Sequence, residues 1–210
     1  MANFSFTEEE KSLIRSAIAK GHGFWGDGSL ADIKGKVKVF LRERQVEVCC
    51  YCSRNTDNEF KMVLDIEHVI PKSVLVSEMF ELNNLAASCK RCNMSIKKED
   101  VSFINEDINT FKAGGRYYLS ESYKFLHPNL DKWDDNLHYY VVQRNDRKMV
   151  YYNVVEGSEK GEYTKKYFRL ADIQVNTFDE VQEATARKEP VDPEVASKYI
   201  KLVDSMLSKN

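Results

Sequence analysis

Two short stretches, VCCYCS at residues 48–53 and SCKRCN at residues 88–93, hold all five cysteines of this chain and decide its fold. Each stretch contains a pair with the spacing C-x-x-C: Cys49 with Cys52, and Cys89 with Cys92. Two such pairs on one chain supply the four thiolates of a tetrahedral structural zinc site. The sequence therefore predicts a zinc ion that ties together the two ends of the intervening segment.

A disulfide, a redox pair and a nucleophilic thiol are the alternatives for these cysteines. The odd number argues against full disulfide pairing, and no βαβ pattern surrounds either pair as in a thioredoxin-like motif. The acidic, amphipathic start at residues 1–18 lacks the basic and apolar parts of a secretory signal. We therefore expect a cytoplasmic protein with reduced thiols. Cys50, the fifth cysteine, is expected to pack as a small apolar side chain.

Composition limits the way in which this chain can contact nucleic acid. Its 210 residues include 31 basic and 33 acidic side chains, for a formal net charge of −2. A protein that binds nucleic acid by bulk charge is strongly basic, so any such contact here comes from a local patch or a partner. No apolar run approaches the roughly 18 residues that a membrane span needs, and we expect no membrane contact.

The periodicity of apolar residues predicts an α+β fold. Thr7 is expected to cap the first helix and Ser29 the second, and Asp192 is a candidate cap for the last. We expect helices at residues 7–20, 29–44, 178–189 and 193–208, strands within residues 59–70, and a β-hairpin at residues 138–157.

Three regions follow from this pattern. Residues 1–46 form an N-terminal helical region, and residues 47–100 form the cysteine-dense core. Residues 101–210 form a C-terminal extension made of the hairpin and helices. We expect this extension to pack with the core as one unit, because no linker-like composition separates them.

The segment between the cysteine pairs carries a second pattern. Its elements are Glu67-His68, Pro71 and Asn83-Asn84-Leu85, and the pattern continues through Cys89 and Cys92 to Asn93 and Lys97. This order resembles the HNH endonuclease family in its zinc-stapled form. The resemblance implies a ββα-metal core, in which two short strands and a helix surround one catalytic divalent ion.

The chemistry of these side chains agrees with that resemblance. Phosphodiester hydrolysis needs a base to activate water and a cation to stabilise the charge on phosphate and leaving group. His68, with an ordinary pKa near about 6.5, suits the general base. Glu67 and Asn93 offer hard oxygen ligands for Mg²⁺ or Mn²⁺. The resemblance assigns the same roles, places Asn84 as the residue that orients the histidine, and leaves Asp65 as a further candidate ligand.

Each assignment has a plainer alternative. His68 could be structural, Glu67 could be a solvated strand residue, and Asn93 could only cap a helix, while Asn83 is expected to be a turn residue. Basic side chains near the expected metal could contact phosphates or simply form a solvated helix face. These basic residues are Lys90, Arg91, Lys97 and Lys98.

A second resemblance concerns the C-terminal extension. FLHPNLDKWDDNLHYY at residues 125–140 and KGEYTKKYFRL at residues 160–170 resemble segments of HNH proteins encoded beside ATPases, including nuclease subunits of Septu-type anti-phage systems. Ala171 departs from that pattern, in which an asparagine is expected. The resemblance implies a bacterial defence role with an ATPase partner. The roles of His127 and His138 stay open.

Together, these observations predict a metal-dependent HNH endonuclease that hydrolyses DNA and carries a structural zinc. An RNA nuclease, for instance one acting on tRNA, is an alternative, because the motif reads phosphate rather than sugar. A zinc-stapled binding or interaction subunit without catalysis is another.

Overall fold

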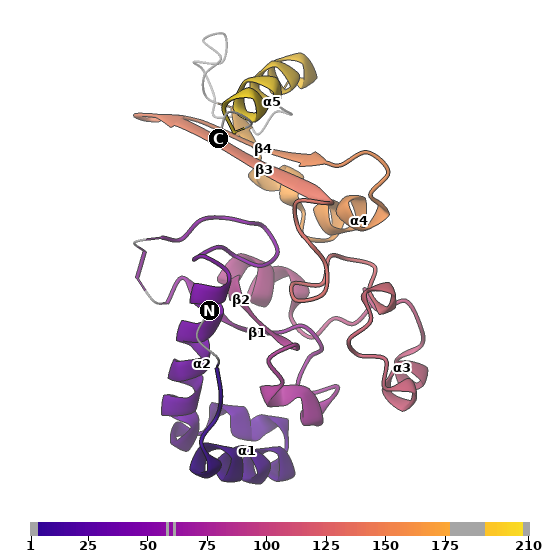
Figure 1. The fold of residues 1–210 in the computed structure, drawn as a ribbon. Helices are drawn as coiled ribbons and strands as arrows, with labels where there is room; N and C mark the ends of the chain where they lie inside the picture. Colours follow the sequence, from indigo (N-terminus) through magenta and orange to yellow (C-terminus); the bar gives the residue numbers. More distant parts are fainter. Residues whose placement is uncertain (1–3, 58, 61, 177–191, 208–210) are drawn as a thin grey trace. The chain divides into compact units, whose positions relative to one another are not determined.

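The computed structural model describes residues 4–57, 59, 60, 62–176 and 192–207. The chain divides into two compact units, Met1–Lys132 and Trp133–Asn210 (Figure 1). Helices and short strands occur in both units, which confirms the predicted α+β fold class. The predicted boundaries at residues 46 and 100 stay a prediction. Within the described residues, no helix is long and apolar enough to cross a membrane.

The first helix, α1 (Glu8–Lys20), forms as the sequence predicts. The Thr7 side chain accepts a hydrogen bond from the backbone N–H of Glu10, and the Glu10 carboxylate accepts one from the backbone N–H of Thr7. This reciprocal pair satisfies two amides that a helix start otherwise leaves without partners. The helix ends at Gly21, whose φ of 90° lies in the region that favours glycine.

The second helix, α2 (Ala31–Arg44), begins differently from the prediction. Ser29 does not cap it; instead the Asp27 carboxylate accepts hydrogen bonds from both the backbone N–H and the hydroxyl of Ser29. The short turns η1 (His22–Gly26) and η2 (Gly28–Leu30) lead into the helix. The apolar face of this segment is buried, and it consists of Leu30, Ile33, Val37 and Leu41.

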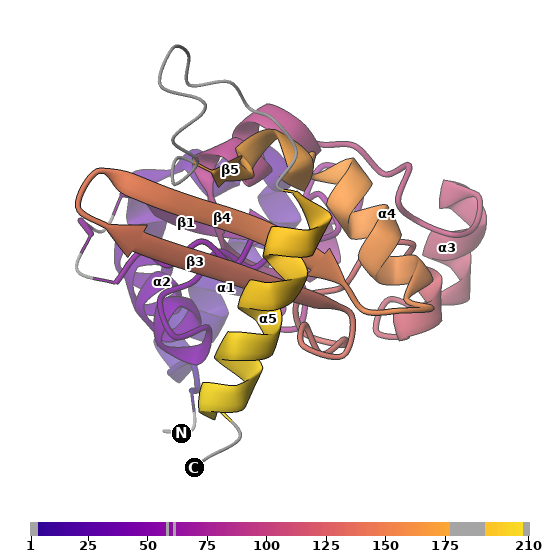
Figure 2. The ribbon, with the colours of Figure 1, turned by 90° about the horizontal axis from the view of Figure 1, so that it is seen from above.

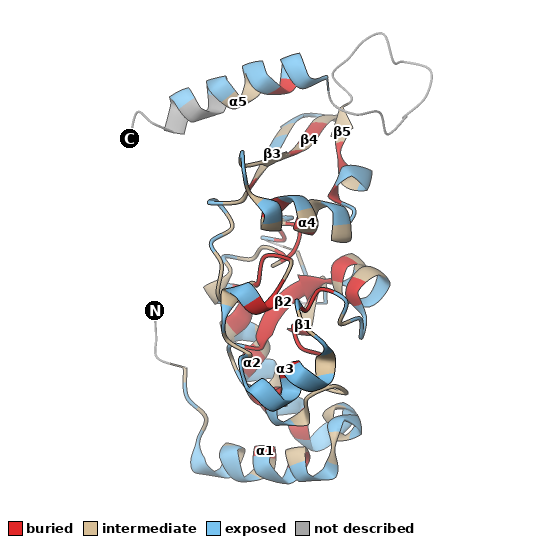
Figure 3. Cartoon of the chain, turned by 90° about the vertical axis from the view of Figure 1, so that its right-hand side faces the viewer, coloured by how far each residue is buried: buried red, intermediate tan, exposed pale blue. Residues whose placement is uncertain are grey.

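Two short antiparallel strands, β1 (Leu64–His68) and β2 (Leu85–Cys89), form the centre of the first unit. All five residues of β2 are buried, and Figure 3 shows this strand in red. β1 is shorter than the apolar run at residues 59–70, because Phe60 and Met62 lie in the preceding turn and are exposed.

A loop and a helical turn complete the core of the first unit. The loop between the strands contains the turn η3 (Val76–Phe80). β2 is followed by η4 (Arg91–Lys97), a π-helix in which the Lys98 N–H donates to the Asn93 carbonyl (2.8 Å). Further along the chain are α3 (Ile108–Gly114) and η5 (Ser120–Ser122). The order strand, strand, helical turn is the one that the HNH resemblance implies.

The second unit is built on a β-hairpin. β3 (Leu137–Arg144) pairs with β4 (Arg147–Val154), which confirms the predicted hairpin, and Asn145 adopts a φ of 57° in its turn. β5 (Val175–Asn176) pairs with the other edge of β4. The helix α4 (Glu159–Tyr167) and the turn η6 (Leu170–Ile173) lie between β4 and β5 in the sequence.

The last helix, α5 (Pro193–Leu207), confirms the predicted C-terminal helix. Asp192 accepts a hydrogen bond from the Glu194 N–H (2.7 Å), as a cap does. α5 lies across the hairpin, where Ala196 and Tyr199 pack with Met149 (Figure 2). Tyr151 of the hairpin packs against the same cluster, and Tyr152 is buried. The helix predicted at residues 178–189 lies outside the described residues.

Candidate active site and zinc site

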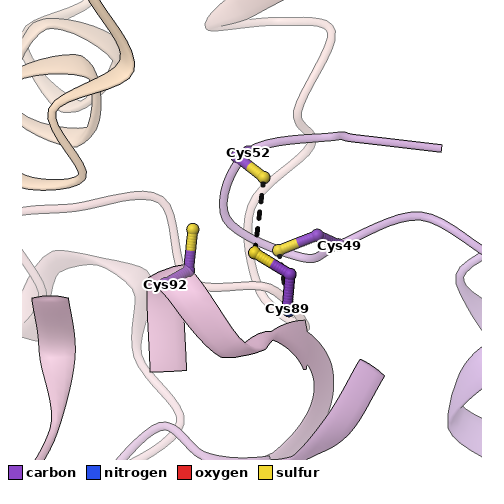
Figure 4. Close-up of side chains that lie close together, drawn as sticks. All are labelled: Cys49, Cys52, Cys89 and Cys92. Atoms are coloured by element: carbon purple, nitrogen blue, oxygen red, sulfur yellow. Dashed lines mark hydrogen bonds between the residues drawn. The ribbon is translucent and has the colours of Figure 1, made fainter. Parts of the chain in front are cut away.

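The four cysteines of the two C-x-x-C pairs come together in one buried cluster (Figure 4). Their sulfur atoms all lie within 4.8 Å of one another, and the Sγ atoms of Cys52 and Cys89 are 3.9 Å apart. A tetrahedral zinc with Zn–S bonds of about 2.3 Å places its sulfurs about 3.8 Å apart. The cluster has the geometry and the donor atoms of a structural zinc site, and these cysteines could bind zinc.

The surroundings of Cys49 favour its thiolate. The backbone N–H of Cys89 donates to the Cys49 sulfur (3.3 Å), a contact that stabilises negative charge on sulfur. Burial alone would raise the pKa of Cys49, but hydrogen bonds from the neighbouring thiols outweigh it and hold that pKa well below its usual value. Cys50 lies outside the cluster, as predicted, and burial raises the pKa of its thiol.

A cavity of about 210 Å³ lies beside the ends of β1 and η4. Four of the predicted catalytic and metal-binding residues line it together: Asp65, Glu67, His68 and Asn93. Its wall also includes Trp25, from the turn η1, and two lysines, Lys72 and Lys98. The cavity therefore combines a histidine, oxygen donors and positive charge, which is the combination that phosphodiester chemistry requires.

His68 is held as a neutral imidazole. Its Nε2 lies 3.0 Å from the Met79 carbonyl oxygen, and because a carbonyl can only accept, Nε2 carries the proton. The lone pair is then on Nδ1, where a base needs it. Burial, with the positive charge of Lys72, lowers the pKa of His68 from its ordinary 6.5 to about 3. The ring is therefore unprotonated at neutral pH.

Glu67 is 2% exposed and paired inside the protein. Its Oε1 accepts a hydrogen bond from the Tyr51 hydroxyl (3.1 Å) and forms an ion pair with the Lys97 ammonium (2.8 Å). Burial raises the pKa of this carboxyl, and the Lys97 charge opposes that rise. A carboxylate has about four lone-pair positions, so these two contacts leave acceptor capacity on Glu67 for a cation.

Asn84 does not line the cavity; it organises the loop behind it. Its Oδ1 accepts from the Ile70 N–H (2.7 Å), and its Nδ2 donates to the Ile70 and Glu78 carbonyls (3.1 and 3.0 Å). Glu78 immediately precedes Met79, the residue whose carbonyl holds His68. The hydrogen bonds of Asn84 therefore reach the loop segment that contacts His68, and its role in orienting the histidine stays a prediction.

Asn93 and Asp65 are both positioned by neighbouring groups. The Asn93 Nδ2 donates to the Ile66 carbonyl (3.5 Å), which leaves Oδ1 as the acceptor for a cation. Asp65 is partly exposed and pairs with Lys38 of α2 (3.3 Å). Asp65 and Glu67 are therefore both carboxylates that pair with a lysine and line the cavity, and with Asn93 they are the candidate ligands.

Comparison with known proteins identifies the segment that contains this site. Residues 49–99 match the model of the HNH endonuclease family. The chain contains an HNH endonuclease domain. Over 107 residues, 49% of its length, the chain is also 32% identical to the Septu protein PtuB of Bacillus thuringiensis. That match spans 38% of the length of the curated relative, and no solved structure matches the chain.

Within the HNH domain, one basic residue differs from the prediction. The Lys97 side chain is fully buried, and its Nζ also donates to the His68 carbonyl (2.9 Å). It therefore does not belong to a solvated phosphate-binding face, because Glu67 and the backbone already hold its ammonium. Lys90 and Lys98 are exposed, and Arg91 is half-buried.

Replacing Lys97 by methionine is expected to destabilise the HNH domain by about 3–5 kcal/mol, because it leaves the buried Glu67 carboxylate without its cation. The free energy of unfolding in urea measures this effect. Lys98→Met is the matched control, since Lys98 is exposed, and we expect a change within about 0.5 kcal/mol. The Lys97→Met/Glu67→Gln double variant should recover part of the loss. Equal stability of Lys97→Met and wild type would refute the importance of this ion pair.

Sequence reasoning missed three residues of the site. Trp25 lies in a glycine-rich turn outside the HNH motif. Tyr51 lies between two cysteines, and that stretch was interpreted only as a zinc-binding sequence. Lys72 follows Pro71 and gave no signal beyond its charge.

The two histidines whose roles the sequence left open lie outside the cavity. His127 packs against the Tyr123 ring at 4.6 Å, and its Nδ1 accepts a hydrogen bond from the Asn129 N–H. His138 lies in the second unit, with Nε2 3.1 Å from the Asp134 carbonyl.

Proposed function

We propose that this protein is a metal-dependent endonuclease that hydrolyses phosphodiester bonds of DNA through its HNH domain. The observation that carries the proposal is the cavity in which a neutral His68 faces the same space as Glu67 and Asn93. A binding module without catalysis has no need for a histidine with a fixed tautomer next to oxygen donors. The intact set therefore supports an enzyme.

The residues of the cavity divide the chemistry among them. His68 Nδ1 takes the proton of the attacking water, while the Met79 carbonyl keeps the opposite side of the ring in its N–H form. Lys72 and Lys98 are the cavity lysines that can contact the substrate phosphates. Asn84 and Lys97 hold the loop and the carboxylate in place.

The donor set suits a small divalent cation. Glu67 and Asn93 would hold it, and when bound it would stabilise negative charge on the phosphate and on the leaving oxygen. One carboxylate and one amide oxygen are few ligands, which fits Mg²⁺ or Mn²⁺, since Mg²⁺ usually keeps several waters and takes further ligands from substrate phosphate. The four-cysteine cluster has no open position for this role.

The likeness to Septu PtuB supports a role in anti-phage defence. In this proposal an ATPase subunit is the partner, and it supplies much of the nucleic-acid affinity. The formal net charge of −2 supports that division, because the chain lacks the excess positive charge of a protein that binds DNA by itself.

The test is cleavage of plasmid DNA and of total RNA by purified protein, with Mg²⁺, with Mn²⁺ and with neither. We expect metal-dependent cleavage of the plasmid. Asn93→Ala should shift the metal dependence to higher concentration by about tenfold or more, because a direct ligand is lost. Asn83→Ala is the matched control, since Asn83 is exposed and does not line the cavity, and its metal dependence should equal that of wild type.

Two outcomes would change the proposal. Cleavage of RNA but not of DNA would replace DNA as the substrate and keep the enzyme. If neither nucleic acid is cut under any metal condition, the free-standing endonuclease is refuted.

A further inference from the structure

The turn η1 brings an aromatic side chain from outside the HNH domain into the active-site cavity. Trp25 lies 24 positions before the first residue of the segment that matches the HNH family, and it lines the cavity with His68. The ring centroids of Trp25 and His68 are 4.5 Å apart, with an interplanar angle of 81°. This is the edge-to-face geometry that aromatic rings prefer.

The turn that carries Trp25 is anchored on both sides. On one side Gly21, with its φ of 90°, accepts a hydrogen bond from the Phe24 N–H (3.0 Å). On the other side the Lys34 ammonium of α2 donates to the Trp25 carbonyl (2.9 Å). The Trp25 ring also packs against Phe80, at 5.2 Å between centroids. The position of the Trp25 side chain in the cavity wall is therefore fixed by contacts on several sides.

The contact with Trp25 restricts the orientation of the His68 ring, which a single hydrogen bond does not determine. The bond from Nε2 to the Met79 carbonyl holds one atom of the imidazole, and it lasts only while the ring keeps the orientation that points Nε2 at that oxygen. Trp25 packs against the ring and limits its rotation away from that orientation. A base is effective only when its lone pair keeps the angle at which it meets the water.

We propose that Trp25 is a positioning residue that fixes the orientation of His68 and thereby preserves the tautomer that the Met79 carbonyl selects, so that the N-terminal region is part of the catalytic unit. The inference rests on the proposed function, because it takes His68 as the base. Trp25 itself does not touch the reacting atoms. It acts through the contact with the imidazole.

The test compares Trp25→Ala and Trp25→Phe in two measurements. The first is long-range ¹H–¹⁵N NMR of the four histidines, which distinguishes an Nε2–H from an Nδ1–H imidazole without any need for activity. For wild type and Trp25→Phe we expect His68 to give the Nε2–H pattern. For Trp25→Ala we expect an exchange-averaged pattern. The second measurement is kinetic: kcat of Trp25→Ala should fall about 100-fold with KM unchanged, and Trp25→Phe should restore most of it.

Phe24→Ala is the matched control, because Phe24 is the neighbouring aromatic residue of the same turn and does not line the cavity. Its tautomer pattern and its kcat should equal those of wild type. Thermal unfolding and zinc content of every variant show whether it is folded. If Trp25→Ala loses its fold, Trp25→Leu, which keeps apolar bulk without a ring, takes its place.

An unchanged Nε2–H pattern in a folded Trp25→Ala or Trp25→Leu protein would overturn the proposal. So would a kcat that stays at the wild-type value. Failure of the proposed function has a different signature: wild type then cuts no nucleic acid, while the NMR comparison still reports whether Trp25 holds His68.

Discussion

Replacing His68 by alanine is expected to reduce the rate of phosphodiester cleavage by about 10²- to 10⁴-fold, the usual contribution of a general base. The neutral ring, its Nε2 bound to the Met79 carbonyl and its Nδ1 left with the lone pair, is the group best prepared in this cavity to accept a proton from water. Single-turnover cleavage of a plasmid measures the loss.

His138→Ala is the control for that experiment, since His138 lies in the second unit and not in the cavity. It should cleave like wild type. Zinc content and thermal unfolding of His68→Ala must match wild type, so that the loss reports chemistry and not folding. A folded His68→Ala protein that keeps more than about a tenth of the wild-type rate would exclude His68 as the base.

The pH dependence of the wild-type rate gives an independent check on the same residue. A base works in its unprotonated form, so the rate falls as pH drops through its pKa. With the pKa of His68 lowered to about 3, protonation of this residue should not reduce the rate between about pH 5 and pH 8. The same lowered pKa affects stability. Between pH 6.5 and about 3, His68 binds a proton in the unfolded chain but stays unprotonated in the folded protein. The free energy of unfolding therefore decreases as pH falls through that window.

Replacing Cys92 by serine is expected to remove zinc and to unfold most of the HNH domain. Small zinc-stapled domains depend on the metal for their fold, and binding contributes about 10–16 kcal/mol in zinc-finger peptides at neutral pH. Cys92 belongs to η4, and Asn93 is the next residue, so loss of the zinc also displaces a candidate ligand of the catalytic cation. Metal analysis and circular dichroism measure the two effects.

The variant Cys50→Ser tests whether zinc binding depends on the four clustered cysteines and not on every cysteine of the chain. Cys50 lies beside the four ligands in sequence but outside their group. The variant should keep its zinc and unfold within a few degrees of wild type, as expected for a change of about 1 kcal/mol or less. If Cys50→Ser loses zinc while Cys92→Ser retains it, the grouping of the four cysteines is wrong.

The parts of the structure that depend on short-range spacing could be predicted from sequence. Two thiols separated by two residues can reach one ion, and Thr7 with Glu10 can complete a capping box, whatever the rest of the chain does. The hairpin, whose turn contains Asn145, likewise depends on residues that are close together in the sequence. Ser29 was wrong as a cap because Asp27 lies two residues earlier and is the better acceptor of the local amide.

What could not be predicted are contacts between distant segments. Lys97 meets Glu67 across 30 positions, and Trp25 meets His68 across 43, and neither pair has a sequence pattern of its own. Lys97 looked like a surface cation because its neighbours are basic and charged residues are rarely fully buried. Only the folded core shows that a buried carboxylate takes this lysine as its partner.

Side chains at the end of α2 form hydrogen bonds with the backbone of β2. The Gln45 amide donates to the Ala87 carbonyl (2.8 Å) and accepts from the Ala87 N–H (2.7 Å), while Arg44 donates to the Leu85 carbonyl (2.7 Å). These side chains occupy backbone groups of β2 that its pairing with β1 leaves unused. An open strand edge is a template for pairing with other chains and hence for aggregation. Gln45 and Arg44 therefore help to close, without a third strand, the edge along which copies of this protein would otherwise join. The Cys50 N–H at the Ala87 carbonyl (3.0 Å) and the Asn129 amide at the Leu85 carbonyl (3.0 Å) complete this cover.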